Sequence, residues 1–312
     1  MAGAAFATYI APARARPQLW RLLAGLVLTA VLYVGPIVGL ALLVAHVLGA
    51  DDGVPWYRDL MGGRSPGGVA ALLFSFVAMA VGPVLSVRWL HKRPVGSLFG
   101  PRRGGGRAFL IAGSVIFAAW LLGLFFLLLA LPVERNLPLS SWLIWLLPVL
   151  IGVAIQTGAE EMLFRGYMQQ QLAVRFDSPL VWMVVPSLIF GMLHLDLTNG
   201  VVEGWLTVAV TALVGLIAAD LVARTGAIWA AWGMHFANNV FAITILGKPG
   251  VLDGMALFLL PDGDGVTLRG LLLIDMGAFL ALWAVLRWLL PTGFVASTAL
   301  RREANAGSGR KA

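Results

Sequence analysis

The sequence predicts an all-α, polytopic membrane protein, a bundle of about eight transmembrane helices. Of its 312 residues, 60% are hydrophobic and 12% are charged, and the mean hydropathy is +0.89. Soluble globular domains average about 45–50% apolar and about 25% charged residues. The apolar residues form continuous runs instead of alternating with polar ones. Because only helices and closed barrels can cross a bilayer, these runs indicate transmembrane helices.

Eight apolar runs are candidates for crossing a membrane, since a span needs about 20 apolar residues. The fifth of them is short. The first follows a basic segment, as a signal peptide would, but it is too long for a signal sequence and has no small-residue cleavage site, so we assign it as a span. The runs cover residues 20–48, 68–90, 108–131, 141–164, 179–195, 202–222, 227–246 and 270–290.

The basic residues predict the orientation of the chain. Most of the 22 Lys and Arg residues fall in the two termini and in alternate loops, above all in the loop "HKRPVGSLFGPRRGGGR". The positive-inside rule then places both termini in the cytoplasm, and we expect a location in the inner (cell) membrane. We expect three parts: a cytoplasmic segment 1–19, a single membrane domain 20–290, and a disordered cytoplasmic tail 291–312.

Composition also excludes some functions. The chain has no cysteine, so it forms no disulfide and carries out no thiolate chemistry. No clustered basic face accompanies a recognisable nucleic-acid-binding module, so a nucleic-acid partner is not expected. The Gly-, Pro- and Asp-rich stretch "GADDGVPWYRDLMGGRSPGG" predicts turns and a loop on the outer side.

Ionisable residues inside apolar runs are functional candidates because charges are costly in hydrocarbon. Glu161 and Arg165 are spaced i, i+4 with the acid first, the better order for a helical ion pair. Glu160 points about 100° away on a helix. It would stand in an apolar pocket, suited to act as a base near neutral pH. The alternative is that both glutamates are interfacial charges ending the fourth span.

Two histidines and an asparagine fall at depths that overlap with Glu160. At 1.5 Å per residue, Glu160 lies about 15 Å from the cytoplasmic surface and His194 about 22 Å. By the same rise, His235 lies at about 12 Å and Asn239 at about 18 Å. His235 and Asn239 share one helix face, and so do Phe190 and His194. The sequence therefore predicts one shared polar site.

These residues form three ordered motifs within the motif-bearing core, residues 141–246. The motifs resemble those of the CAAX-protease and bacteriocin-processing family of intramembrane endopeptidases, which includes the type II CAAX prenyl endopeptidases. Each motif is weak alone, and their order on successive apolar helices is specific. The motifs are E-E-x-x-x-R at Glu160, Glu161 and Arg165, F-x-x-x-H at Phe190 and His194, and H-x-x-x-N at His235 and Asn239.

The resemblance implies an endopeptidase whose active site lies toward the cytoplasmic side. Glu160 would activate a water molecule with help from His194. His235 and Asn239 would donate hydrogen bonds to the oxyanion of the tetrahedral intermediate. The supporting residues would be Glu161, Arg165 and Phe190.

Members of the family are often described as metalloproteases. Zinc held by Glu160, His194 and His235 is therefore an alternative. The sequence has no H-E-x-x-H pattern, and a glutamate-activated water needs no ion, so we favour a mechanism without a metal.

Two other functions stay open beside the protease. One is a non-catalytic immunity or scaffold protein of the membrane. The other is a proton-coupled transporter, although no duplicated halves with paired helix breaks are visible. The expected partners are the lipid bilayer and a peptide or membrane-protein substrate. High Arg and Ala usage favours a bacterial source, so the substrates would be peptides, bacteriocins or membrane proteins.

Overall fold

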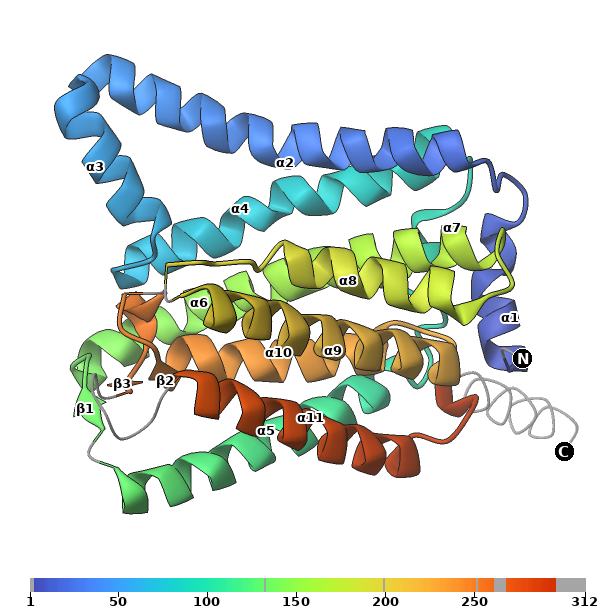
Figure 1. Ribbon diagram of the computed structural model, residues 1–312. Coiled ribbons are helices and arrows are strands. Elements are labelled where there is room, and N and C mark those ends of the chain that lie inside the picture. The colour runs from blue at the N-terminus through green and yellow to red at the C-terminus, as the bar shows by residue number, and fades with distance from the viewer. Residues whose placement is uncertain (1–2, 132, 199, 251, 261–267, 296–312) are drawn as a thin grey trace, which may run out of the picture.

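In the computed structural model the chain forms a bundle of long helices, closed at one end by a small sheet (Figure 1). The structure describes residues 3–131, 133–198, 200–250, 252–260 and 268–295. The α-helices are α1 (Ala4–Ile10), α2 (Leu19–Leu48), α3 (Ala50–Met61), α4 (Pro66–Leu85), α5 (Gly105–Ala130), α6 (Leu139–Glu161), α7 (Gln170–Ala173), α8 (Val185–Met192), α9 (Val201–Thr225), α10 (Trp229–Thr244) and α11 (Leu268–Leu289).

Three segments are wound as π-helix and continue neighbouring α-helices. They are Ser86–Leu90 after α4, Met162–Gln169 between α6 and α7, and Leu180–Val184 before α8. Three short strands form the sheet in the order β1-β3-β2: β1 (Glu134–Arg135) is antiparallel to β3 (Phe258–Leu259), and β2 (Leu246–Gly247) is parallel to it.

The all-α membrane architecture is confirmed. Six of the described helical segments are long and apolar enough to cross a bilayer: 19–48, 66–90, 105–130, 139–173, 201–225 and 268–289. The two other predicted spans are helical but shorter, namely Leu180–Met192 and α10. The count of eight full spans is therefore not confirmed.

Local chemistry explains why the fifth predicted span is short. After α8 the chain turns at Asp196, whose Oδ1 accepts hydrogen bonds from the backbone N–H of Thr198 at 2.9 Å and from its hydroxyl at 2.6 Å. This side chain offers the backbone a turn in place of another helical turn. The helical segment therefore ends close to the end of the predicted run 179–195.

One prediction about the end of the first span is wrong. The outer stretch expected to be a loop forms α3, which follows α2 after Gly49 with φ +80°. Asp51 and Asp52 lie in the first turn of α3, where carboxylates interact favourably with the helix dipole. The N-terminal segment contains α1, which buries Phe6 against Trp182, with 4.9 Å between ring centroids.

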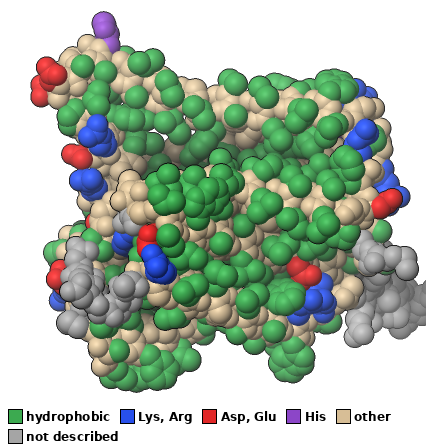
Figure 2. Space-filling model, in the orientation of Figure 1, with side chains coloured by type: hydrophobic (Ala, Val, Ile, Leu, Met, Phe, Trp, Pro, Cys, Tyr) green, Lys and Arg blue, Asp and Glu red, His purple; other side chains and the backbone are tan. Residues whose placement is uncertain are grey.

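The surface matches a bilayer environment. Apolar side chains cover the middle of the face shown in Figure 2, and charged ones gather toward its two ends. Both α1 and the end of α11 lie at one end of the bundle, opposite the sheet (Figure 1). Arg224 at the end of α9 donates to the carbonyl oxygens of Arg287 and Leu290, at 3.0 and 3.4 Å. The predicted tail 291–312 lies outside the described residues from 296 onward.

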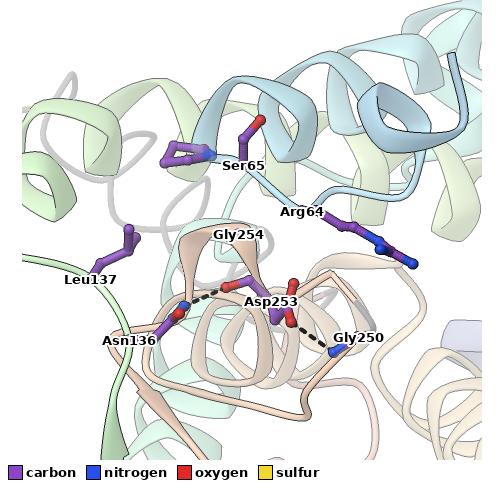
Figure 3. Close-up of a pocket in the computed structure, with 8 residues that line it drawn as sticks. Arg64, Ser65, Asn136, Leu137, Gly250, Asp253 and Gly254 are labelled. Atoms are coloured by element: carbon purple, nitrogen blue, oxygen red, sulfur yellow. Dashed lines mark hydrogen bonds between the residues drawn. The ribbon is translucent and has the colours of Figure 1, made fainter. Parts of the chain in front are cut away.

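A polar cavity of about 350 Å³ lies at the sheet end (Figure 3). Asn136 Nδ2 closes one side of it by donating to the carbonyl oxygen of Asp253 at 2.7 Å, and Asp253 Oδ2 accepts from the backbone N–H of Gly250 at 2.7 Å. None of the three motifs contributes to its lining.

Candidate active site

The two glutamates lie inside the bundle at the end of α6. Glu160 is 7% exposed and Glu161 is fully buried. The helix does not end there, because the π-helical turn Met162–Gln169 continues it. Such turns occur often at functional sites. The alternative of interfacial charges at a helix end does not fit this burial.

Close packing of α10 against α6 depends on a glycine before the glutamates. A Cβ on Gly158 would lie 2.9 Å from Cζ2 of Trp232, closer than real Cβ contacts. Trp232 Nε1 also donates to Thr157 Oγ1 at 3.1 Å. The sequence T-G-A-E-E thus lets α10 approach near enough for its polar side chains to contact the glutamates.

The ion pair expected from the i, i+4 spacing is present. Arg165 Nη1 lies 3.2 Å from Glu161 Oε1, and its Nη2 donates to the carbonyl oxygen of Gly215 at 3.1 Å. The guanidinium also lies over the ring of Phe190, 5.0 Å from its centroid. Arg165 is 2% exposed, so its guanidinium interacts mainly with protein groups and not with water.

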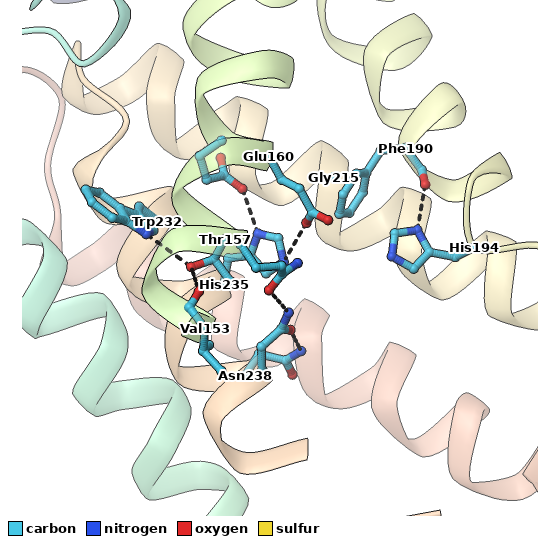
Figure 4. A network of polar contacts seen from close by, with 12 residues as sticks. Val153, Thr157, Glu160, Phe190, His194, Gly215, Trp232, His235 and Asn238 are labelled. Atoms are coloured by element: carbon cyan, nitrogen blue, oxygen red, sulfur yellow. Dashed lines mark hydrogen bonds and ion pairs between the residues drawn. The ribbon is translucent and has the colours of Figure 1, made fainter. Parts of the chain in front are cut away.

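His235 lies between the two carboxylates (Figure 4). Its Nδ1 is 3.0 Å from Glu161 Oε1, and its Nε2 is 3.4 Å from Glu160 Oε2. With a protonated imidazole, the two carboxylates are balanced by His235 and Arg165, so the buried group has no net charge. The sequence did not predict that one histidine would contact both glutamates.

His194 and Phe190 lie across from these groups, in and just after α8. The His194 Nδ1 is 2.8 Å from the carbonyl oxygen of Phe190, as Figure 4 shows. The Phe190 ring is edge-on to His194 at 4.9 Å and to His235 at 5.8 Å between centroids. The imidazole of His194 is exposed, whereas that of His235 is 5% exposed.

A largely apolar cavity of about 390 Å³ connects Glu160 with His194. Its walls come from α2, α4, the α6 end with its π-helical turn, and α8. The polar groups of Thr29 and Tyr33 are on the α2 wall. The lining residues are Leu26, Thr29, Ala30, Tyr33, Val34, Phe76, Met79, Glu160, Leu163, Phe164, Phe190, Leu193 and His194.

Asn239 lies one turn after His235 on α10. Its Nδ2 donates to Gln156 Oε1 at 2.9 Å, and Gln156 lies one turn before Glu160 on α6. Sequence analysis did not single out Gln156. Its i, i+4 spacing to Glu160 within an apolar run was the available signal.

The residues suggested as zinc ligands do not form a ready ligand set. Among the described residues, no group of three or more His, Asp or Glu side chains is arranged to hold a metal ion. His235 directs both ring nitrogens at glutamates, and His194 directs Nδ1 at a backbone carbonyl. Zinc sites generally use three or four protein ligands, so we derive no step through a metal.

All three motifs lie within a segment that can be compared with known proteins. Residues 138–241 match the model of the Rce1-like family. That model is described as type II CAAX prenyl endopeptidase Rce1-like, and it includes all three motifs. The resemblance drawn from the motifs is thereby confirmed over this Rce1-like segment.

A relative and the solved structures add less. The chain is 34% identical over 131 residues to a Bacillus subtilis (strain 168) protein described as "Uncharacterized protein YyaK". The aligned region covers 40% of this chain and 43% of the relative, less than half of each. No solved structure matches the chain significantly.

Proposed function

We propose that this protein is an intramembrane endopeptidase in which Glu160 activates water to hydrolyse a peptide bond. One observation carries the proposal: within the Rce1-like segment, the Glu160 carboxylate lines a largely apolar cavity, and its Oε2 is held by no hydrogen bond in the described part of the chain, with His235 Nε2 3.4 Å away. A buried carboxylate that is held this loosely can still take a proton from water. A general base must be within hydrogen-bond reach of that proton, which the cavity allows.

In the proposed reaction Glu160 acts first as a base and then as an acid. Glu160 takes one proton from water as the water oxygen forms a bond to the carbonyl carbon of the substrate. The carbonyl oxygen becomes an oxyanion. When the C–N bond breaks, the protonated Glu160 gives its proton to the departing nitrogen. The products are a carboxylic acid and an amine, and the glutamate is ionised again.

His194 would orient the attacking water. A backbone carbonyl can only accept, so the 2.8 Å contact with Phe190 fixes the proton of His194 on Nδ1. In the neutral ring Nε2 is then an acceptor. Because His194 and Glu160 line the same cavity, Nε2 can accept one hydrogen of a water molecule whose other hydrogen points at Glu160.

His235 and Asn239 would stabilise the oxyanion. A doubly protonated His235 donates from Nδ1 to Glu161 and presents Nε2–H beside Glu160. Donors that the protein already holds in place stabilise developing charge well, at about 10²–10³ in rate for a single donor. Glu161 and Arg165 hold the imidazole in place through the 3.0 and 3.2 Å contacts.

The lining of the cavity also favours one class of substrate. Its apolar walls suit a hydrophobic peptide or a membrane-protein segment that reaches the site from the bilayer. We propose a bacterial cell membrane as the location, with both termini cytoplasmic and peptides, bacteriocins or membrane proteins as substrates. A non-catalytic immunity or scaffold role is the competing outcome.

The test is cleavage of a peptide library by the purified protein in detergent, read by mass spectrometry. Glu160→Gln keeps the shape of the side chain and removes the base, so we expect cleavage to fall to background while the thermal unfolding midpoint changes little. Asp275→Asn, a similar change in α11 outside the cavity, is the matched control and should cleave like the wild type. Cleavage by Glu160→Gln at the wild-type rate would refute the assignment, and a wild type inactive on every peptide would favour the scaffold role.

A further inference from the structure

A chain of side-chain hydrogen bonds runs from α5 through α10 to α6 and passes through Asn239. Trp120 Nε1 on α5 donates to Asn238 Oδ1 at 3.1 Å. Asn238 Nδ2 donates to Asn239 Oδ1 at 3.1 Å, and Asn239 Nδ2 donates to Gln156 Oε1 at 2.9 Å. Gln156 is buried, and Trp120 and the two asparagines are half-buried.

The chemistry of Trp120 fixes the direction of this chain. An amide side chain can be turned over, exchanging donor and acceptor, but an indole Nε1–H can only donate. Asn238 must therefore present its oxygen to Trp120, which leaves its NH₂ for Asn239. Asn239 must then accept through Oδ1, which leaves its NH₂ for Gln156. One tryptophan thus sets the orientation of three amides.

This orientation decides whether the oxygen or the NH₂ of the Asn239 side chain faces α6. Its Oδ1 is turned along its own helix to Asn238, whereas its NH₂ is turned toward α6, the helix of Glu160. One N–H is used by Gln156 and the second is left to donate. A chain of the opposite direction would turn an oxygen toward α6 instead, and that oxygen would repel an oxyanion.

We propose that Trp120, Asn238 and Gln156 are positioning residues that hold the Asn239 amide with its NH₂ toward the site. The inference rests on the proposed endopeptidase function and deepens it. Gln156 accepts the hydrogen bond from Asn239, and it lies on the face of α6 that carries Glu160 one turn later. A preoriented donor costs no reorganisation when charge develops, which is why its direction affects the rate.

The first test is Trp120→Phe, which removes the indole N–H and keeps an aromatic ring between Phe241 and Phe279. Losing one orienting hydrogen bond should lower kcat about 3- to 10-fold, with KM nearly unchanged. The matched control is Trp142→Phe, because Trp142 Nε1 also donates to α10, at 2.7 Å to the carbonyl oxygen of Thr244, but outside the amide chain. Equal kcat values for Trp120→Phe, Trp142→Phe and the wild type would overturn the proposal.

A second variant separates direction from hydrogen-bond number. In Asn238→Asp the side chain still accepts from Trp120, but it can no longer donate to Asn239. Asn239 would turn over to donate to the introduced carboxylate, and its oxygen would accept from Gln156. We expect kcat to fall more than in Trp120→Phe while the hydrogen bonds persist. An unchanged kcat in Asn238→Asp would mean that direction does not matter and would overturn the proposal.

A double-mutant cycle tests the chain of hydrogen bonds through the unfolding midpoint, without an activity measurement. If Trp120 acts through Asn239 and Gln156, the effect of Trp120→Phe on the unfolding midpoint should shrink in a Gln156→Leu background. Additive shifts in the midpoint would show that the chain is not coupled and would overturn the proposal. A wild type that cleaves nothing refutes the proposed function, whereas active wild type with additive variants refutes only this inference.

Discussion

Replacing Arg165 should destabilise the fold far more than replacing a surface arginine. Arg165→Met removes the arginine 3.2 Å from the fully buried Glu161, which keeps only His235 at 3.0 Å, and removes the side-chain donor to the Gly215 carbonyl. Breaking a buried ion pair on one side costs about 3–5 kcal/mol. At an unfolding entropy of about 2.1 cal/mol/K per residue, each kcal/mol shifts the midpoint of this chain by roughly 1.5 °C, so the midpoint should fall by roughly 5–8 °C.

The matched control is Arg269→Met, which breaks a 2.9 Å pair with Glu203 whose arginine side chain is 54% exposed. Exposed pairs contribute about 0–1 kcal/mol, so that midpoint should stay close to the wild type. Differential scanning fluorimetry in one detergent measures both variants. Adding Glu161→Gln to Arg165→Met removes the unpaired charge while Oε1 still accepts from His235, so part of the loss should be recovered. A midpoint for Arg165→Met equal to that of Arg269→Met would refute the structural role of the pair.

The remaining predictions concern helix packing and the loop after α4. Gly158→Ala places a Cβ 2.9 Å from Trp232 and should lower the free energy of unfolding by about 1–3 kcal/mol. It should also lower cleavage by separating Glu160 from His235. In the control Gly123→Ala the new Cβ has no atom within 4 Å, so stability should stay equal to the wild type or rise slightly. Burial lowers the pKa of His91 to about 4, so the folded protein binds fewer protons there than the unfolded chain does. Stability should therefore fall as the pH drops from about 6.5 toward 4. Thermal unfolding across this range should show a weaker pH dependence for His91→Gln, and identical curves would contradict the prediction.

Continuous apolar runs predicted the helices because a transmembrane helix requires mainly a run of about 20 apolar residues. The i, i+4 spacing predicted the Glu161–Arg165 contact because both residues lie on one helix, where geometry is known in advance. Where chain reversals begin was harder to predict. The stretch after Gly49 has loop-like composition, but two aspartates at its start and packing against α2 make it a helix.

Contacts between helices could not be derived in the same way. Depth estimates placed His235 and Glu160 at similar levels, but which histidine approaches which carboxylate depends on how α10 and α8 are rotated. The structure places His235 against both glutamates and puts the Phe190 ring next to His194. Trp120 lies 118 residues from Asn238, and no spacing rule relates an indole on one helix to an amide on another.

The shortness of the helical segment Leu180–Met192 affects the surrounding lipid. At 1.5 Å per residue it spans roughly 20 Å, against about 30 Å of hydrocarbon. Its exposed face is apolar at Leu188 and Ile189, which suits contact with acyl chains. A bilayer crossed by so short a segment would thin locally to match it. Such thinning would bring headgroups and their hydration water closer to His194, so the membrane itself would supply water to the proposed hydrolytic site.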